Sequence, residues 1–303
     1  MTLQQLHYIL ALDAHRHFGR AAEACHVTQA TLSMMVQKLE QELGCRLFDR
    51  SRQPIVPTDL GARIVAQARE VVRQAERLQE LATDERQGLQ GELHLGIIPT
   101  LAPYLLPALL GALAAAYPGL RLHMAEYTTA VLVDKLRTGT LDMALLSTPL
   151  AEAGLRQEVL FDEPFRLYAT PAEQGPLLPT HPKQLDPAKL WLLEEGHCMR
   201  DQVLAFCQLA RRHPANERPV YQAGSIETLR QLVDQLGGYT VVPALAVATF
   251  GPEAQARVQP FAEPAPTRQI SLVCAESYPR ERLLLAVADT ARTVGLGKLR
   301  VES

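Results

Sequence analysis

The chain has 303 residues, of which 47% are hydrophobic, 21% are charged and 5% are aromatic. This length is typical of two or three domains, and the composition excludes disordered, collagen-like and disulfide-scaffold proteins. The 30 Lys and Arg residues and 33 Asp and Glu residues give a net charge of −3, which favours neither a nucleic acid nor a membrane as partner. Any such partner must therefore be argued from local features.

The five cysteines are widely scattered, which indicates a reducing compartment rather than a disulfide framework. Residues 1–13 carry neither a basic stretch nor a small-residue cleavage site, so we predict no secretory signal. The uncharged segment 95–120 contains three prolines in its first half, which would break a membrane-spanning helix. We read that segment as a buried strand, a turn and a helix, and we predict a cytoplasmic protein with no membrane partner.

Residues 1–57 are predicted to form a winged helix-turn-helix DNA-binding domain. Residues 18–25 read as one short helix, and Thr28 is a good N-cap for a second helix that ends near Gly44. Two helices joined by so short a connection are typical of a helix-turn-helix. Spacings of four, three and four residues place four apolar side chains on the core face of the second helix: Leu32, Val36, Leu39 and Leu43.

The opposite face of the second helix and the segment after it are the candidate DNA interface. Side chains on that face could touch base edges in a major groove. Residues 45–58 read as a short hairpin, or wing, whose arginines suit phosphates. The candidate DNA-binding residues are Gln29, Ala30, Thr31, Ser33, Met34, Gln37, Arg50 and Arg52. The alternative is a small helical domain that packs against something else, because this geometry also occurs without DNA.

Residues 58–88 are predicted to form a long linker helix that pairs two chains. The segment contains no proline, and apolar residues recur every seven positions along it. The predicted seam consists of Ile64, Val71 and Leu78 with Ala68, Ala75 and Ala82 at the second position. Alanine allows helices to approach closely, so we expect a dimerisation helix. The alternative is an amphipathic helix that lies on its own chain.

Residues 89–303 are predicted to form an α/β domain. Short apolar runs alternate with helical patterns, which indicates a sheet of largely parallel strands. The predicted strands cover residues 93–98, 121–127, 142–147, 165–170, 191–194, 240–242 and 270–274. Ligands of such sheets bind beyond the carboxyl ends of the strands. Thr100, Thr129, His197 and Ser225 follow predicted strands and are candidates for that edge, although Thr100 and Ser225 are also good helix N-caps.

Cys198 is the candidate reactive cysteine. It is predicted in the first turn of a helix, between His197 and Arg200. A helix N-terminus and a nearby guanidinium both favour the nucleophilic thiolate. A structural cysteine or a metal ligand are the alternatives. Cys207, among apolar residues, is expected to be buried and inert.

The remaining cysteines are Cys25, Cys45 and Cys274, and we interpret them as small core residues. No CxxC or histidine spacing groups the cysteines into a zinc site, so we predict neither a metal nor a cofactor.

The order of helix-turn-helix, wing, long helix and α/β domain resembles the LysR-type transcriptional regulators over essentially the whole chain. Three segments of the first domain match that family's signature: Arg20-Ala-Ala, Thr31-Leu-Ser33 and residues 38–44. Within the family the chain resembles the OxyR-type peroxide sensors. That likeness rests on His15-Arg-His-Phe18, Phe206-Cys207 and residues 96–100, 104–107, 194–202, 227–230 and 243–246.

The resemblance implies a periplasmic-binding-protein-like effector domain with two α/β subdomains, approximately residues 89–163 plus 268–303, and residues 164–267. It implies that Cys198 reacts with hydrogen peroxide and that Cys207 then forms a disulfide with it. Thr100, Thr129 and His197, with Arg200, would bind the peroxide. The implied partners are promoter DNA, further copies in a homodimer or homotetramer, and RNA polymerase.

Two other functions remain open. The chain could be a LysR-type regulator whose cleft binds a small metabolite and whose cysteines are incidental. It could also be a thiol peroxidase, although a helix-turn-helix serves no purpose in enzymatic turnover.

Overall fold

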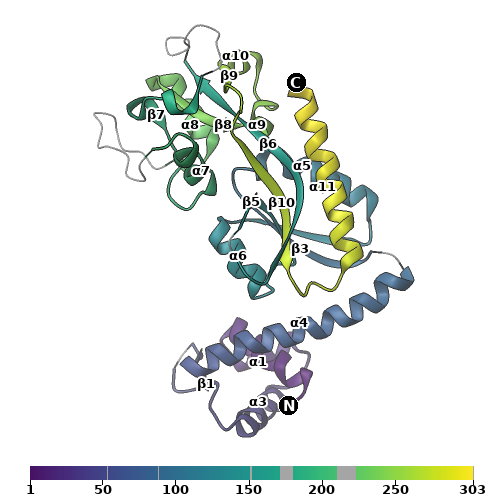
Figure 1. Cartoon of the computed structure of the whole chain (residues 1–303). Helices are drawn as coiled ribbons and strands as arrows, with labels where there is room; N and C mark the ends of the chain where they lie inside the picture. The colour runs from purple at the N-terminus through teal and green to yellow at the C-terminus, as the bar shows by residue number, and fades with distance from the viewer. Residues whose placement is uncertain (53, 88, 151, 171–179, 210–222, 303) are drawn as a thin grey trace. The chain divides into compact units, whose positions relative to one another are not determined.

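The computed structural model describes residues 1–302 apart from 53, 88, 151, 171–179 and 210–222. The chain divides into two compact units, Met1–Gly88 and Leu89–Ser303 (Figure 1). Each unit has a hydrophobic core of its own.

The first unit contains the predicted pair of short helices. Its helices are α1 (Leu3–His15), α2 (Phe18–Ala24), α3 (Gln29–Leu43) and α4 (Asp59–Gln87). The hydroxyl of Thr28 accepts a hydrogen bond from the Thr31 N–H at 3.2 Å, which caps α3 as predicted. Gly44 ends α3 with φ at +66°, a left-handed conformation that glycine adopts without a steric penalty.

The core face of α3 is largely as predicted. Leu32, Val36 and Leu39 are fully buried. Leu43 was predicted on the same face, but it is 39% exposed. It is the last residue of the helix, beyond the part that the core covers.

The wing is present as a short antiparallel hairpin of β1 (Phe48–Asp49) and β2 (Val56–Pro57). The buried carboxylate of Glu40 accepts hydrogen bonds from the backbone N–H groups of Leu47 and Phe48, at 2.8 and 3.3 Å. A side chain of α3 therefore fixes the start of the wing.

The second unit is an α/β structure around one continuous arrangement of strands. The strands are β3 (Gly91–Ile97), β4 (Leu120–Glu126), β5 (Met143–Thr148), β6 (Leu155–Ala169), β7 (Leu190–Trp191), β8 (Tyr239–Pro243), β9 (Val258–Pro260) and β10 (Thr267–Ala275). Among the described residues they pair in the order β4-β3-β5-β10-β6-β8-β7, and β9 pairs with β6. The long strands β6 and β10 connect the two ends of this order.

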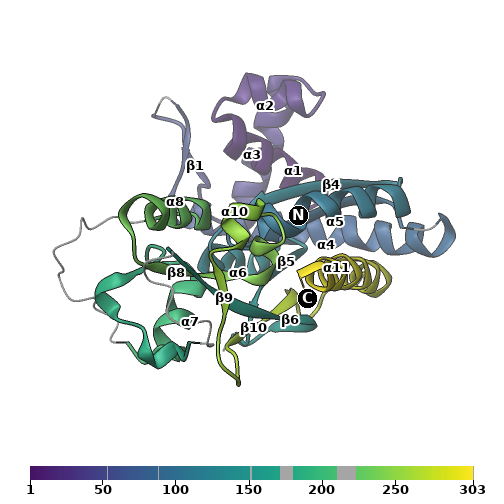
Figure 2. The same cartoon turned by 90° about the horizontal axis from the view of Figure 1, so that it is seen from above.

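The helices of the second unit pack on the faces of the sheet. They are α5 (Ala102–Ala116), α6 (Thr129–Arg137), α7 (Cys198–Phe206), α8 (Ile226–Leu236), α9 (Ala244–Val247), α10 (Pro252–Gln255) and α11 (Glu281–Glu302), with 3-10 turns at Pro182–Gln184 and Pro187–Lys189. The C-terminal α11 packs on β6, α5 and α9, and Figure 2 shows α5 and α11 side by side.

The α/β class is confirmed, but the prediction of largely parallel strands is wrong. Strand β3 is parallel to β4 and β5, and β7 is parallel to β8. Strand β10 is antiparallel to β5 and β6, and β6 is antiparallel to β8 and β9. Apolar patterning does not encode strand direction, and β10 comes from near the end of the chain to lie between β5 and β6.

The uncharged segment after residue 94 folds as predicted into a buried strand, a turn and a helix. Pro103 lies in the first turn of α5 and Pro107 lies inside that helix. In the part of the chain that the structure describes, no helix is both long and apolar enough to cross a membrane.

Candidate functional site

The exposed face of α3 carries the candidate base-contacting residues. Gln29, Ala30 and Gln37 are exposed, and Met34 is 61% exposed. Thr31 and Ser33 are half-buried. The face opposite the core is therefore open along the helix, as contact with a nucleic-acid groove requires.

The two wing arginines are exposed but hold ion pairs. Arg50 donates to Glu40 Oε2 at 2.9 Å, and its guanidinium lies 5.2 Å from the centre of the Phe18 ring. Arg52 pairs with Asp49 at 3.3 Å. Arg50 therefore has a structural partner on α3 in addition to its predicted role toward phosphate.

The predicted seam on α4 falls into two parts, one packed on its own unit and one exposed. Of the predicted seam residues, Ala68 is buried in the core of its own unit and Ile64 packs against that core, so both face their own chain rather than a partner. Val71 is 39% exposed and Leu78 is 70% exposed. The side chain of Ala82 lies outside the described residues. Val71 and Leu78 are thus available for a partner helix, and pairing through them stays a prediction.

Cys198 is the first residue of α7 and is half-buried. Gly196 adopts φ of +98°, a conformation that favours glycine, and turns the chain toward the helix. His197 occupies the N-cap position without a side-chain cap, so it does not occupy the N–H groups of the first turn. A helix N-terminus favours negative charge, so an effect of this end of α7 on the Cys198 sulfur stays a prediction.

His197 and Arg200 occupy distinct environments beside this cysteine. His197 is buried, and its Nε2 lies 3.8 Å from Glu194 Oε1. Arg200 Nη1 donates to the carbonyl oxygen of Leu193 at 2.9 Å. Arg200 therefore ties α7 to the segment before it, and its action on Cys198 stays a prediction.

Cys207 closes the other end of α7 as its C-cap and is buried, as predicted. Burial raises the pKa of its thiol to about 12. Both Cys198 and Cys207 are free thiols in this structure. Nine residues of helix separate them, which corresponds to roughly 13.5 Å along the axis and opposite helix faces.

The other three cysteines contact the cores of their units. Cys274 is buried on β10, as predicted. Cys25 and Cys45 are only half-buried and pack against the core of the first unit.

Thr100 is held by a buried arginine that the sequence analysis did not select. Arg268, on β10, is fully buried. Its Nη1 donates to Thr100 Oγ1 at 2.8 Å and its Nη2 donates to the Thr100 carbonyl at 3.0 Å. Arg268 Nε also donates to the equally buried Glu163 at 2.8 Å. Thr100 is thus a fixed acceptor, not the N-cap of α5, which is Leu101.

A second pair of polar groups lies at the carboxyl end of β5. Gln202, on α7, donates from Nε2 to Ser147 Oγ at 2.8 Å. The Oε1 atom of Gln202 and the Oγ1 atom of Thr129 are both buried without a hydrogen-bond partner. A Cβ atom on Gly196 would lie 3.9 Å from the side chain of Thr128. The start of α6 and the loop before Cys198 therefore meet, and the two unsatisfied polar atoms belong to α6 and α7.

Ser225, which also follows a predicted strand, acts as a helix cap and not as a candidate ligand. Ser225 Oγ accepts from the Thr228 N–H at 3.2 Å and caps α8, as the N-cap interpretation held. Ser147 was missed because it lies in a strand whose sequence predicts only burial, and Arg268 was missed because it lies just before the predicted strand 270–274. The local signal for Arg268 was a charged residue beside the apolar run 270–274, but its partner Thr100 is 168 positions away.

Comparison with known proteins defines the family. Residues 3–62 match the bacterial regulatory helix-turn-helix proteins of the lysR family, and residues 86–295 match the LysR substrate binding domain. The chain belongs to the LysR family. It is therefore a transcriptional regulator with a helix-turn-helix unit and a LysR substrate-binding unit.

Individual relatives match the chain over nearly its full length. The hydrogen peroxide-inducible genes activator of Haemophilus influenzae is 36% identical, over 97% of this chain and 98% of that protein. The DNA-binding transcriptional dual regulator OxyR of Escherichia coli is 37% identical, over 96% and 95%. Among solved structures, a full-length OxyR variant from Pseudomonas aeruginosa is 39% identical, with a TM-score of 0.76 over 96% of this chain and 98% of that one.

Proposed function

We propose that this LysR-family regulator binds promoter DNA through α3 and the wing and senses hydrogen peroxide through Cys198 and Cys207. The observation that carries the proposal is the position of these two cysteines at opposite ends of α7, in a chain whose full-length relatives bear the name of peroxide-inducible activators.

The chemistry needs two steps. The Cys198 thiolate attacks one peroxide oxygen, the O–O bond breaks, and hydroxide leaves and takes up a proton, which gives a sulfenic acid and water. The Cys207 thiol then attacks the sulfur of that sulfenic acid, the S–O bond breaks, and a second water leaves as the disulfide forms. Two electrons pass from the two thiols to the peroxide, so no further reductant or cofactor is needed.

Three observations support the placement of the peroxide beside Cys198. Thr100 is oriented by Arg268, and Thr129 carries a buried hydroxyl without a partner. His197 is buried next to the cysteine in the chain. Each of these side chains can donate to or accept from a peroxide oxygen. Arg200 would supply a further hydrogen-bond donor for the peroxide.

The second step converts oxidation into a change of shape. A disulfide tolerates at most about 7 Å between Cα atoms, whereas nine helical residues span roughly 13.5 Å. Helix α7 must therefore unwind before Cys207 can reach Cys198. Its inner side chains Met199, Val203 and Leu204 are buried in the reduced fold, so unwinding repacks the core of the unit.

The helix-turn-helix unit supports regulation rather than turnover, because a stand-alone thiol peroxidase has no use for it. We propose that the protein is a switch in the cytoplasm, where promoter DNA and RNA polymerase are its partners, and that it acts as a homodimer or homotetramer.

The deciding experiment is intact-mass analysis of the reduced full-length protein before and after peroxide, with peptide mapping and DNA-binding measurements on the same samples. We expect a loss of two hydrogens localised to Cys198 and Cys207. The Cys198→Ser variant should lose the response, and Cys207→Ser should accumulate a sulfenic acid without the full change in DNA binding. The matched control is Cys274→Ser, which should respond like the wild type.

Two results would overturn the proposal. If Cys198 stays unmodified at peroxide concentrations that change DNA binding, the cysteines are incidental and a metabolite-binding regulator takes its place. If the protein consumes peroxide continuously with a thiol reductant, it is a peroxidase.

The proposed assembly has its own test. The double variant Val71→Asp, Leu78→Asp places charges on exposed positions of α4, so the first unit should still fold. We expect monomers by light scattering, and a folded variant that stays dimeric would refute pairing through this seam. Loss of DNA binding on removal of residues 1–57, with the second unit still folded, is the result expected for the DNA interface.

A further inference from the structure

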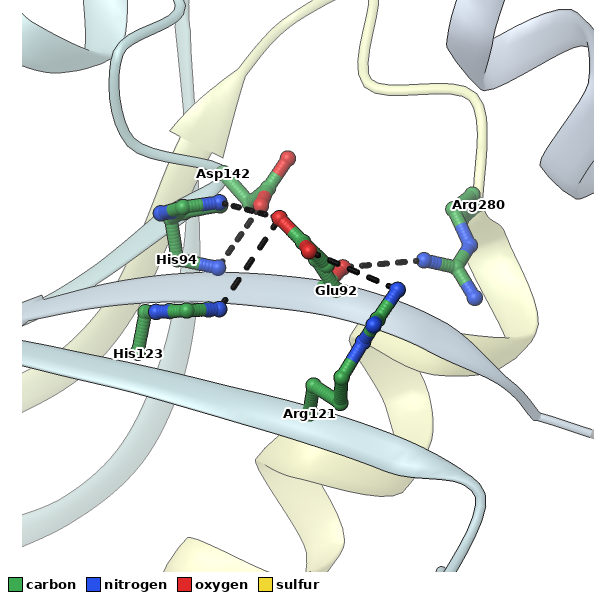
Figure 3. A network of polar contacts seen from close by, with 6 residues as sticks. All are labelled: Glu92, His94, Arg121, His123, Asp142 and Arg280. Atoms are coloured by element: carbon green, nitrogen blue, oxygen red, sulfur yellow. Dashed lines mark hydrogen bonds and ion pairs between the residues drawn. The ribbon is translucent and has the colours of Figure 1, made fainter. Parts of the chain in front are cut away.

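A compact group of metal-ligating side chains lies on the β3–β4 part of the sheet, outside the cysteine region. Strands β3 and β4 are parallel, and His94 lies directly opposite His123 in their register. Glu92 precedes His94 by two positions, so all three side chains lie on one face. Further along the same face, at Gly96, the side chain of Leu132 from α6 covers the sheet. Glu92 and His123 are exposed and His94 is half-buried (Figure 3).

We propose that Glu92, His94 and His123 form a binding site for a divalent transition-metal ion of the Zn²⁺ class. This site is independent of the proposed peroxide switch.

The donor atoms already converge. Nε2 of His94 lies 3.3 Å from Glu92 Oε2, and Nε2 of His123 lies 3.8 Å from the same oxygen. The two imidazole rings are stacked, with centroids 4.5 Å apart and planes 8° from parallel. One ligand atom from each residue fits within 4.8 Å of the others. Tetrahedral Zn²⁺ with bonds of about 2.0–2.1 Å requires ligand atoms roughly 3.3 Å apart. Because a metal lies in the plane of each imidazole that binds it, at least one of the two rings must turn out of the stack for both to bind one ion.

The donor set selects the class of ion. Imidazole nitrogen suits Zn²⁺, Ni²⁺, Co²⁺ and Cu²⁺, whereas Mg²⁺ and Ca²⁺ prefer sites built from oxygen alone. Two histidines and one carboxylate supply three ligands, which leaves a fourth position for water or for another donor.

The backbone that carries these ligands is held in place by neighbouring groups. The N–H of His94 donates to Asp142 Oδ2 at 2.8 Å, and Asp142 returns a backbone hydrogen bond to His94 at 2.9 Å. The buried Arg280 donates to the carbonyl of Glu92 at 3.4 Å. Figure 3 shows these contacts on the side of β3 away from His123. The metal would therefore meet a preorganised strand.

One competing charge is present and does not occupy the same oxygen. Arg121 pairs with Oε1 of Glu92 at 3.5 Å, whereas both histidines approach Oε2. The Arg121 side chain is 75% exposed, so this ion pair contributes little. A metal on Oε2 can keep Arg121 as a partner of the second oxygen.

A bound metal would add a cross-link between β3 and β4, and β4 is the edge strand at one end of the described order of the sheet. An ion that binds the folded chain and not the unfolded one stabilises the fold by mass action. Thermal unfolding therefore provides a readout that needs neither DNA nor peroxide.

The test uses the reduced full-length protein, freed of metal by a chelator and dialysis, and titrated with Co²⁺ and then with Zn²⁺. Cobalt bound by nitrogen and oxygen gives visible absorption without the thiolate charge-transfer bands that cysteine ligands produce. We expect the wild type to bind one equivalent of Co²⁺ that shows no thiolate bands, and we expect Zn²⁺ to displace it. His94→Gln and His123→Gln should each lose that equivalent. His181→Gln, a change at another exposed histidine of the same unit, should retain it.

Zn²⁺ should also raise the unfolding temperature of the wild type and of His181→Gln more than that of His123→Gln. Circular dichroism at room temperature establishes that the variants are folded. The proposal is overturned if the wild type binds no such equivalent, or if His94→Gln and His123→Gln bind as much metal as His181→Gln. Cys198→Ser should still bind this equivalent of metal. The test of the metal site is therefore independent of the test of the peroxide switch.

Discussion

A substitution at the carboxyl end of α7 should shift the proposed dithiol–disulfide equilibrium without changing either cysteine. Helix α7 ends at Phe206 with Cys207 as its C-cap, and the next residue, Gln208, adopts φ of +58°. The Leu209 N–H donates to the Leu204 carbonyl at 2.9 Å, the hydrogen bond of a Schellman ending. That ending favours glycine at the position of Gln208, because a side chain is strained in the left-handed conformation. We therefore predict that Gln208→Gly stabilises the reduced helix.

The magnitude follows from the conformation. Relief of the left-handed strain contributes about 1 kcal/mol, and disulfide formation must undo this helix ending. A stabilisation of the dithiol by about 1 kcal/mol shifts the dithiol–disulfide equilibrium about fivefold toward the dithiol. For a two-electron couple it makes the reduction potential about 20 mV less negative. A matched variant, Ala205→Gly, removes the methyl group of an exposed residue inside α7 and weakens the helix by about 1 kcal/mol, so its potential should become about 20 mV more negative.

The assay is a redox titration of each variant in thiol buffers, with the fraction of Cys198 and Cys207 in the disulfide read by alkylation and mass spectrometry. Opposite shifts for Gln208→Gly and Ala205→Gly are expected. Equal potentials for the two variants, or shifts of the same sign, would refute the idea that α7 unwinds when the disulfide forms.

Three further results are expected. Thr28→Ala removes the cap of α3 and should lower the free energy of unfolding of the first unit by about 1 kcal/mol, measured by denaturant titration; no change would show that the hydrogen bond to Thr31 contributes nothing. Arg268→Met leaves the buried carboxylate of Glu163 without its ion-pair partner and should cost about 3–5 kcal/mol in the same assay on the second unit; an unchanged midpoint would contradict the buried pair. Burial raises the pKa of Cys207 to about 12, so only about one thiol in 10⁴ is ionised at pH 8. Iodoacetamide should therefore modify Cys207 slowly in the reduced protein and faster as pH rises toward 12. Rapid alkylation at pH 8 would contradict the burial of this thiol.

Local patterns in the sequence determined the elements whose formation depends on near neighbours. The spacing of Leu32, Val36 and Leu39 fixes the buried face of α3, and Thr28 and Gly44 mark where that helix begins and ends. A hydrophobic face and a cap act over three or four residues, so they can be read without knowledge of the rest of the chain. The position of Cys198 at the start of a helix follows from the same kind of information.

Tertiary structure alone decided which distant groups meet. The direction of β10 and its place between β5 and β6 set the pairing of Arg268 with Thr100 and Glu163. The parallel register of β3 and β4 puts His94 opposite His123. These contacts join segments far apart in the chain, and the side chains involved have no periodicity that marks a partner. Their geometry depends on strand order and register, which are set by how the entire core packs.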